Sequence, residues 1–579
     1  MPEPNMLYYG DNLDVLRRHL RDEAIDLVYL DPPFKSNVDY NVLFAERGTR
    51  SAAQIRAFTD TWRWDEAAAA DYQATVEQGG RIAEALRGFR TVLGTSDMLA
   101  YLSMMAPRLL ELRRVLKPTG SIYLHCDPAA SHYLKLLMDS IFGPENFRNE
   151  LVWRRTGAHS PRRSFGPVHD TMLFYSRGNE YYFKTLRVPY MRGHVERRYK
   201  ADATGGLKFS SGGNVLTGAG ATAGESGQPW RGFDPSAKHR HWAVPGFLTE
   251  QMPEDFKQLG VLAKLDALYE AGLIEITPGA AWPVPIRYLS TTAGQPISDI
   301  WAYQPYTEGT MYGTEEGIDA DVAWMGPTDP ERLGYPTQKP RGLLERVISS
   351  SCPEDGVLLD PFCGCGTTID AAQHLGRRWI GIDITHLAIG LIKHRLTDVY
   401  GVGIAGTYRV VGEPTDVGGA RQLAHDDPFQ FQAWALGLAG ARVAGSDRKG
   451  GDKGIDGRLY FHDEGASARS KAVVFSVKAG HLVPAFVRDL RGVLDREEAQ
   501  IGVLLSFEQP SSGMRAEAAS AGFYDSPWGT RHARLQLLTV EQLLDGKGID
   551  YPSMTGANVT HRRAQRAKGP GEQDQLSLA

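Results

Sequence analysis

Four residues near the N-terminus, Asp31-Pro32-Pro33-Phe34, have the types and spacing of a site that binds an amine. Two prolines stiffen this segment, the acceptor loop, and carry no backbone N–H, so the Asp31 carboxylate and a proline carbonyl remain as acceptors. An exocyclic NH2 donates two protons, and accepting both frees its lone pair to attack a sulfonium methyl. Phe34 offers a flat face for stacking on a base. Since Asp-Pro is common in turns, a plain strand-end turn is the alternative.

A second segment, Asp360-Pro361-Phe362-Cys363-Gly364-Cys365-Gly366-Thr367-Thr368, lies between a predicted strand and a predicted helix. Glycines in this glycine loop let the backbone approach a ligand and turn tightly into the helix. Asp383 ends the next predicted strand, about 20 residues on, where an acidic group can bond ribose hydroxyls. The alternative is a turn followed by an unrelated Asp. We expect Cys363 and Cys365 to be small turn residues rather than metal ligands, because no second Cys/His pair has ligand spacing.

An α/β framework must position both loops, and the sequence has its pattern of short apolar runs alternating with amphipathic stretches. The expected strands are 25–30, 121–125, 150–154, 171–175, 356–359 and 379–384. The expected helices are 98–116, with Ser96 as N-cap and 117–120 ending it, then 131–142, 343–349, 367–375 and 386–396. In a doubly wound sheet, strands distant in sequence can lie side by side at the switch point, where ligands bind.

The middle of the chain, from about Phe183 to Gly334, is less regular and rich in Gly, Thr and Pro. Loops this long inside a domain are usually functional or disordered, and the aromatic content argues against disorder. We expect its tryptophans to form a small core rather than to stack on bases: Trp230, Trp242, Trp282, Trp301 and Trp324.

The formal net charge of −5 excludes a globally basic nucleic-acid binder, so any such surface must be a local patch. One candidate patch lies between two predicted strands beside Trp153 and consists of Arg154, Arg155, Arg162 and Arg163. Phosphate contacts need such residues, and the alternative is a solvated loop. With no apolar run near ~18–20 residues, no signal core and too few cysteines for a disulfide framework, we expect a cytoplasmic protein without a membrane partner.

Together the two loops, Tyr29 to Phe34 and Leu359 to Thr368, resemble the amino-methyltransferases of bacterial restriction–modification systems, which modify N6 of adenine or N4 of cytosine. Their order, acceptor loop first, is similar to the beta subclass, and the resemblance covers about residues 6–400. Gly10-Asp11-Asn12-Leu13 resembles the segment that contacts the cofactor adenine. Residues 335–340, Tyr-Pro-Thr-Gln-Lys-Pro, resemble the segment lining the methionine end of S-adenosylmethionine.

The resemblance implies a Rossmann-like, S-adenosylmethionine-dependent fold with a catalytic half at 1–183, an inserted target-recognition region at 184–330 and a cofactor-binding half at 331–412. It implies a base flipped from double-stranded DNA onto the catalytic Asp31, Pro32, Pro33 and Phe34. An Asp in the first position favours N6-adenine, with N4-cytosine as the alternative. Beta-subclass relatives are often dimers, which is the ground for considering a homodimer. The implied cofactor-binding residues are Asp11, Asn12, Thr337, Lys339, Asp360, Phe362, Cys363, Gly364, Gly366, Thr367 and Asp383.

The segment 415–555 resembles the Mrr-like branch of the PD-(D/E)xK nucleases, an α/β restriction-endonuclease-like domain led by a helix at 429–438. The resemblance implies nuclease-like roles for Asp456, Ser476 and Lys478, with Asp456 as a ligand of Mg²⁺ that activates water. Ser476 stands where an acidic or amide residue is expected, and fewer carboxylates hold a hard cation less tightly. The alternative is a DNA-binding module that does not cleave. We expect residues 556–579 to be a disordered tail.

These features leave three functions open. The chain could methylate and cut DNA in one restriction–modification or phage-defence enzyme, or methylate with a non-cleaving C-terminal module. The third is a catalytically dead DNA reader, which the intact acceptor and glycine loops argue against.

Overall fold

The structure, a computed structural model, describes residues 4–33, 64–157, 163–210, 213–335, 337–444, 454–463 and 470–552, with Thr560 and Ala564. Phe34 and Arg162 therefore lie outside the described residues. The chain divides into a first unit, Met1–Lys184, Asp299–Ala302 and Asp321–Asp574, and a second unit, Thr185–Ser298, Tyr303–Ala320 and Gln575–Ala579. None of the helices in these described ranges is both long enough and apolar enough to cross a membrane.

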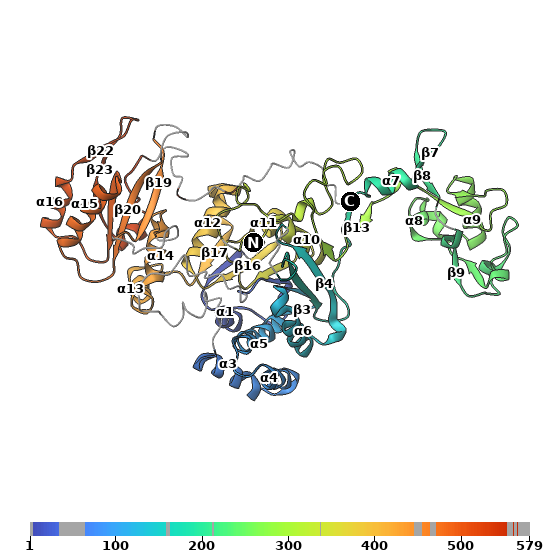
Figure 1. Ribbon diagram of the computed structural model, residues 1–579, viewed down its shortest axis with the longest axis horizontal. Helices are drawn as coiled ribbons and strands as arrows, with labels where there is room; N and C mark the ends of the chain where they lie inside the picture. The colour runs from blue at the N-terminus through green and yellow to red at the C-terminus, as the bar shows by residue number, and fades with distance from the viewer. Residues whose placement is uncertain are drawn as a thin grey trace. The chain divides into compact units, whose positions relative to one another are not determined.

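A nine-stranded sheet forms the centre of the first unit (Figure 1). Every neighbouring pair of its strands is parallel except β4–β5 and β5–β3. This confirms the expected α/β sheet. In order across the sheet the strands are β14 (Ile300–Trp301), β4 (Phe147–Arg154), β5 (His169–Ser176), β3 (Leu116–Cys126), β2 (Ile25–Leu30), β15 (Val357–Asp360), β16 (Arg378–Asp383), β1 (Asn5–Tyr9) and β17 (Tyr408–Val411).

The strand order reverses between β2 and β15. Strands β3, β5 and β4 follow β2 toward one side of the sheet, whereas β16 follows β15 toward the other. Val28 pairs with Leu359 across the reversal, so the ends of two strands far apart in sequence lie side by side. This is the switch point that the sequence predicts between its two loops.

The helices of this part are α1 (Asn12–His19), α3 (Glu66–Glu77), α4 (Gly80–Leu93), α5 (Asp97–Val115), α6 (Pro128–Phe142), α10 (Arg341–Ser351), α11 (Thr367–His374) and α12 (His386–Tyr400). Ser96 caps α5 as predicted, because its Oγ accepts the Leu99 N–H at 3.3 Å. Helix α6 begins three residues before the predicted Ser131. The reason is local, since Asp127 is a good N-cap and Pro128 takes the first position, where no N–H is needed.

The helix before β3 ends ahead of residues 117–120 as predicted, but these residues form a bulge within β3, which begins at Leu116 rather than at Ser121. Ile25 pairs with Leu116 and Leu27 with Ser121, so the bulge stands opposite Asp26 alone. The bulge is held by an ion pair from Lys117 Nζ to Asp26 Oδ2, at 2.7 Å.

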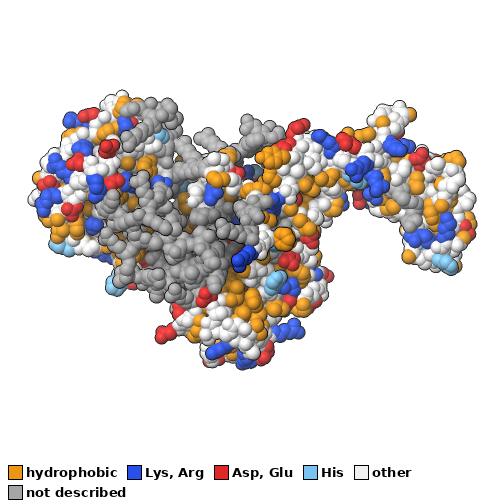
Figure 2. Space-filling view, in the orientation of Figure 1, with side chains coloured by type: hydrophobic (Ala, Val, Ile, Leu, Met, Phe, Trp, Pro, Cys, Tyr) orange, Lys and Arg blue, Asp and Glu red, His pale blue; other side chains and the backbone are white. Residues whose placement is uncertain are grey.

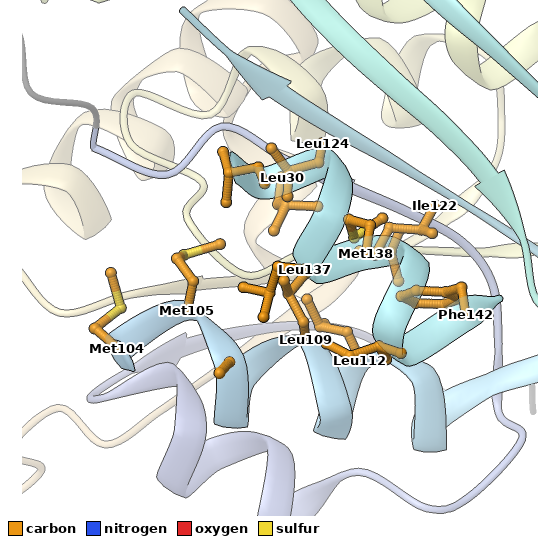
Figure 3. Close-up of a cluster of buried hydrophobic side chains, with 14 of the residues drawn as sticks. Leu30, Met104, Met105, Leu109, Leu112, Ile122, Leu124, Leu137, Met138 and Phe142 are labelled. Carbon is orange, nitrogen blue, oxygen red and sulfur yellow. The ribbon is translucent and has the colours of Figure 1, made fainter. Parts of the chain in front are cut away.

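Helices α5 and α6 pack a buried cluster against β2 and β3 (Figure 3). Leu30, which ends β2, pairs with Leu124 of β3, and both meet Leu109 of α5 and Leu137 of α6; all four have no exposed surface. Burying one such side chain contributes about 1.5–3 kcal/mol. The cluster therefore fixes the carboxyl end of β2 and the place of the residue after it, Asp31.

The second unit is built from short elements. Its helices are α7 (Arg192–Arg198), α8 (Gly246–Thr249) and α9 (Val261–Glu270), and its largest sheet runs β11 (Ile274–Glu275), β12 (Val284–Tyr288), β8 (Leu207–Ser210), β7 (Lys200–Ala201). Trp230 and Trp242 are buried and meet edge to face, with Trp282 packed on the latter. This confirms the expected tryptophan core for Trp230, Trp242 and Trp282, whereas Trp301 and Trp324 belong to the first unit.

The C-terminal part of the first unit has its own mixed sheet, in which β18, β19 and β20 are antiparallel and β20, β21 and β24 parallel. The helix predicted at 429–438 is confirmed as α14, which Asp427 caps. Thr560, in the segment expected to be disordered, accepts the Tyr460 N–H at 2.8 Å. The elements are α13 (Val417–Asp426), α14 (Pro428–Leu438), β18 (Arg442–Val443), β19 (Gly457–Phe461), β20 (Lys471–Lys478), α15 (Ala485–Glu497), β21 (Ile501–Ser506), α16 (Ser512–Ser520), β22 (Phe523–Asp525), β23 (Arg531–Ala533), β24 (Leu535–Thr539) and α17 (Val540–Leu544).

Candidate active site

Carboxylates from three adjacent strands lie at one edge of the large sheet. Asp31 follows β2, Asp360 ends β15 and Asp383 ends β16. Because these strands are parallel neighbours, their carboxyl ends meet at the same edge. The structure thus brings together the acceptor loop and the glycine loop, which the sequence separates widely.

Asp31 has an unforeseen partner in Lys339, whose Nζ bonds Asp31 Oδ2 across 308 positions of sequence. Only 11% of the Lys339 side chain and 18% of the Asp31 side chain are exposed. Pro32 is buried beside them. The sequence assigns Lys339 to the cofactor alone, and no local pattern signals a pair over such a separation. The ammonium group stabilises the charge of the acceptor carboxylate.

The glycine loop turns through two residues with positive φ, Gly364 at +49° and Gly366 at +77°. A Cβ added to Gly366 would lie 2.6 Å from Ile392 Cγ1, and one added to Gly364 would lie 3.3 Å from the Tyr335 ring. No other residue type fits both the backbone and the space. Glycine at these two positions therefore lets the loop turn tightly at the carboxyl end of β15.

Cys363 and Cys365 are buried within this turn. The Gly366 N–H donates to the Cys363 carbonyl at 2.7 Å, which closes the turn tightly. Throughout the described part of the chain, no cluster of His, Cys, Asp or Glu could hold a metal ion.

Asp383 is already engaged within the protein. Its Oδ2 accepts the Gly364 N–H at 3.0 Å, and its Oδ1 accepts the Thr385 N–H and hydroxyl at 2.9 and 2.8 Å. Burial raises the pKa of Asp383 to about 6 against these bonds. The sequence predicts only a ribose contact, but this carboxylate also anchors the glycine loop to the next strand.

Asp360 is a buried carboxyl group beneath the loop. It accepts the Phe362 N–H at 3.0 Å. Burial raises its pKa to about 7, opposed by hydrogen bonds from Thr368 and Phe362 and assisted by the negative charge of Asp31. Asp360 therefore changes charge near neutral pH.

Asn12, at the start of α1 next to Asp11, connects the segment after β1 to the glycine loop. Asn12 Nδ2 donates to the Pro361 carbonyl at 2.9 Å. Arg108 of α5 reaches both residues, with Nε 2.6 Å from Asn12 Oδ1 and Nη2 2.7 Å from Asp11 Oδ2. Sequence reasoning missed Arg108. Its only signal was a charged side chain directly after the long buried stretch of α5.

A second missed residue, Arg395 of α12, supports the glycine loop from below. It is 2% exposed and donates to the Cys365 carbonyl at 3.2 Å and to Thr367 Oγ at 3.0 Å. Asp370 balances its charge at 3.3 Å. Thr337, also predicted from sequence, is partly buried two residues before Lys339.

The described residues of the basic patch start where β4 ends. Because β4 runs parallel to β3, this end lies at the same edge of the sheet as Asp31. Arg154 ends β4 and lies over the Trp324 ring, 5.2 Å from its centroid. Arg155 follows and pairs with Asp170 at 3.1 Å. Arg163 is exposed.

The three nuclease-like positions of the C-terminal part also come together. Asp456 Oδ2 accepts the Val477 N–H at 2.7 Å, and Lys478 Nζ lies 3.7 Å from the same oxygen. Gln432 donates to the Asp456 carbonyl at 3.2 Å, and Ser476 is buried. Mg²⁺ needs several oxygen ligands. Among the described residues this site offers one carboxylate, Asp456, which already accepts an N–H and faces an ammonium group, so the site does not fit Mg²⁺.

Comparison with known proteins identifies relatives of this chain. A type II methyltransferase, M.EcaI of Enterobacter cloacae, is 26% identical over 395 residues, covering 68% of this chain and 69% of the relative. The Mod subunit of the type III restriction-modification enzyme StyLTI of Salmonella typhimurium is 26% identical over 382 residues, covering 64% of this chain and 50% of the relative. The chain thus spans half the length of that subunit.

Among solved structures, a DNA modification methylase from Thermus thermophilus complexed with S-adenosyl-L-methionine aligns with a TM-score of 0.31 and 14% identity, over 70% of this chain and all of the other. A family model described as DNA methylase, of the N6/N4 type, matches residues 25–394. This range includes Asp31, Lys339 and the whole glycine loop. The chain therefore belongs to the N6/N4 family of DNA methylases.

Proposed function

We propose that this chain transfers a methyl group from S-adenosylmethionine to N6 of an adenine flipped out of double-stranded DNA, within a restriction–modification or phage-defence system. The observation that carries the proposal is Asp31 at the end of β2, one strand away from the glycine loop of β15. An Asp in this position favours adenine, and N4 of cytosine is the alternative.

The acceptor loop explains how the chain would activate the amine. The Asp31 carboxylate accepts one amine proton, and a proline carbonyl of the loop accepts the other. Because Pro32 and Pro33 carry no N–H, these two residues offer no backbone donor to compete for the nitrogen lone pair. The base must leave the duplex to reach this loop, at a cost of a few kcal/mol.

The glycine loop suits the cofactor, because its two glycines of positive φ lie at the carboxyl end of β15, beside the switch point where ligands bind in such sheets. S-adenosylmethionine supplies a methyl group on a positively charged sulfur when bound. Asp360, whose pKa burial raises to about 7, would supply a compensating negative charge when ionised. We assign contacts with the cofactor to the residues that the resemblance implies: Asp11, Asn12, Thr337, Lys339, Asp360, Phe362, Cys363, Gly364, Gly366, Thr367 and Asp383.

Target recognition belongs, in this proposal, to residues 184–330, most of which form the second unit. Lys and Arg side chains gather over α7, as Figure 2 shows. Its basic residues Arg192, Arg197 and Arg198 suit contacts with phosphates. Arg154, Arg155 and Arg163 of the first unit supply further candidates at the sheet edge.

Transfer of labelled methyl groups to duplex DNA tests the enzymatic proposal. We expect Asp31→Ala to abolish transfer while S-adenosylmethionine still binds, since the cofactor lies on the neighbouring strands. Asp14→Ala, on the exposed face of α1, is the control and keeps full activity. Undiminished transfer by Asp31→Ala would refute the assignment. Sequencing of the product with detection of modified bases distinguishes adenine from cytosine and gives the target site.

For the C-terminal part, we propose a DNA-binding module that does not cleave. The support is the donor set at Asp456, which offers a hard cation one carboxylate among the described residues, already paired with Lys478. Unmethylated DNA incubated with Mg²⁺ or Mn²⁺ should stay intact with wild type and with Lys478→Ala alike. Cleavage by wild type that Lys478→Ala abolishes would contradict this proposal and favour the nuclease.

A further inference from the structure

A chain of buried polar side chains crosses the sheet edge next to Asp31. Tyr29 Oη lies 2.9 Å from His125 Nδ1, and His125 Nε2 lies 3.2 Å from Asp170 Oδ2. The other carboxylate oxygen, Asp170 Oδ1, lies 3.1 Å from Arg155 Nη1. These residues belong to β2, β3, β5 and the end of β4, which are neighbours in that order. The contacts therefore connect the base of the acceptor loop with the basic patch.

The direction of the hydrogen bonds follows from the charge of Asp170. Burial alone raises its pKa, but the hydrogen bond from His125 and the positive charges of Lys339 and Arg155 outweigh burial and lower it. An ionised carboxylate can only accept, so His125 Nε2 carries a proton. The other ring nitrogen, Nδ1, faces the Tyr29 hydroxyl.

Stability does not explain why polar groups occupy these positions. His125 has no exposed surface, and Tyr29 and Asp170 are 2% and 3% exposed. Apolar side chains of similar volume often stabilise a core as well as a buried ion pair does, or better by ~1–4 kcal/mol. Polar groups here instead restrict position, because the buried Asp170 carboxylate is held by His125 on one oxygen and attracts the Arg155 guanidinium with the other.

Arg155 is fixed by contacts on one side and exposed on the other, so its guanidinium group can bind an anion. Its backbone N–H donates to the Val168 carbonyl at 3.0 Å, and Asp170 holds its Nη1. The side chain is nevertheless 37% exposed. A guanidinium has five N–H donors in a planar fork that matches the oxygens of a phosphate.

We propose that His125 and Asp170 are positioning residues that hold Arg155 so that it binds a backbone phosphate of the target strand at a fixed distance from Asp31. The ligand of this site is a phosphodiester next to the flipped nucleotide. Arg155 makes the contact, and Asp170 and His125 act through it. The inference rests on the proposed methyl transfer to DNA.

A double-mutant cycle on the full chain tests the connection. The KM for a target duplex and the KM for S-adenosylmethionine are measured for wild type, Asp170→Asn, Arg155→Ala and the double variant. We expect each single variant to raise the KM for DNA by about tenfold, or ~1.4 kcal/mol, and to leave the KM for the cofactor unchanged. The double variant should be no worse than Arg155→Ala, because Asp170 acts only through Arg155.

Two further measurements separate positioning from general stability. Loss of one phosphate contact lowers the slope of log affinity against log salt by about 0.9, and both single variants should show this. His125→Gln, whose amide can both donate and accept, should keep the KM of wild type, whereas His125→Leu should not. If Asp170→Asn fails to fold, this pair of variants carries the test.

Asp26→Asn is the matched control. Asp26 is another buried, ion-paired carboxylate of the same sheet, at the opposite end of β2, where it binds Lys117 and the Val357 N–H. It should lower thermal stability without changing the KM for DNA.

An additive double variant, or an equal rise of the DNA KM in Asp26→Asn, would overturn the positioning role. Absence of methyl transfer by wild type would instead overturn the proposed function itself.

Discussion

Replacing Asp360 by Asn should change the pH dependence of stability. Asp360 is 2% exposed at the end of β15, and its Oδ1 accepts the Phe362 N–H. Burial raises its pKa from the ordinary 3.8 to about 7. An amide keeps the acceptor oxygen for Phe362 but has no charge to bury.

The sign and size follow from proton linkage. The folded protein holds the Asp360 proton more tightly than the unfolded chain does, so unfolding releases a proton between pH 3.8 and about 7. The stabilising contribution is therefore complete below pH 3.8, falls as pH rises to about 7, and is lost above it. At ~1.36 kcal/mol per pH unit, the rise of the Asp360 pKa from 3.8 to about 7 corresponds to a change of ~4 kcal/mol in the free energy of unfolding. At pH 8, Asp360→Asn should be more stable than wild type by up to this amount.

Urea unfolding at a series of pH values between 5 and 8 measures the difference in stability between Asp360→Asn and wild type. The transition to follow is the one that S-adenosylmethionine shifts to higher urea concentration, because it reports on the part of the chain that binds the cofactor. Calorimetry gives a second readout, since a positively charged cofactor favours ionised Asp360 and its binding near pH 7 should release a proton in wild type only. Asp355→Asn, an exposed carboxyl group just before the same strand, is the control. Parallel pH profiles of wild type and Asp360→Asn would refute the reasoning.

Two other substitutions have expected outcomes. Gly366→Ala combines a positive φ, costing ~1–2 kcal/mol, with a Cβ 2.6 Å from Ile392, costing ~1–3 kcal/mol. Thermal unfolding and cofactor affinity should both fall, unlike in Gly390→Ala on α12, where a Cβ meets nothing within 4 Å; equal effects in the two would contradict the tight-turn interpretation. Lys339→Met leaves the Asp31 charge without its partner, at a cost of ~3–5 kcal/mol for a buried pair. Single-turnover methyl transfer should slow strongly, and unchanged rates would show that the pair does not assist Asp31.

The sequence by itself determined the features that depend on neighbouring residues. Apolar runs located the strands β2, β15 and β16, since a buried strand needs a short continuous apolar segment. Proline and glycine marked the acceptor loop and the glycine loop, because these residues restrict or extend the backbone conformation wherever they occur. Ser96 identified the start of α5 for the same local reason.

Only the tertiary structure decided which of these segments meet. Lys339 reaches Asp31 because the strand order reverses between β2 and β15, and no periodicity in the chain encodes that order. His125 lies in an expected strand and Asp170 directly before another, and they meet only because β3 and β5 pair. Contacts across a sheet depend on which strands become neighbours, and that choice is made by packing of the whole core rather than by local pattern.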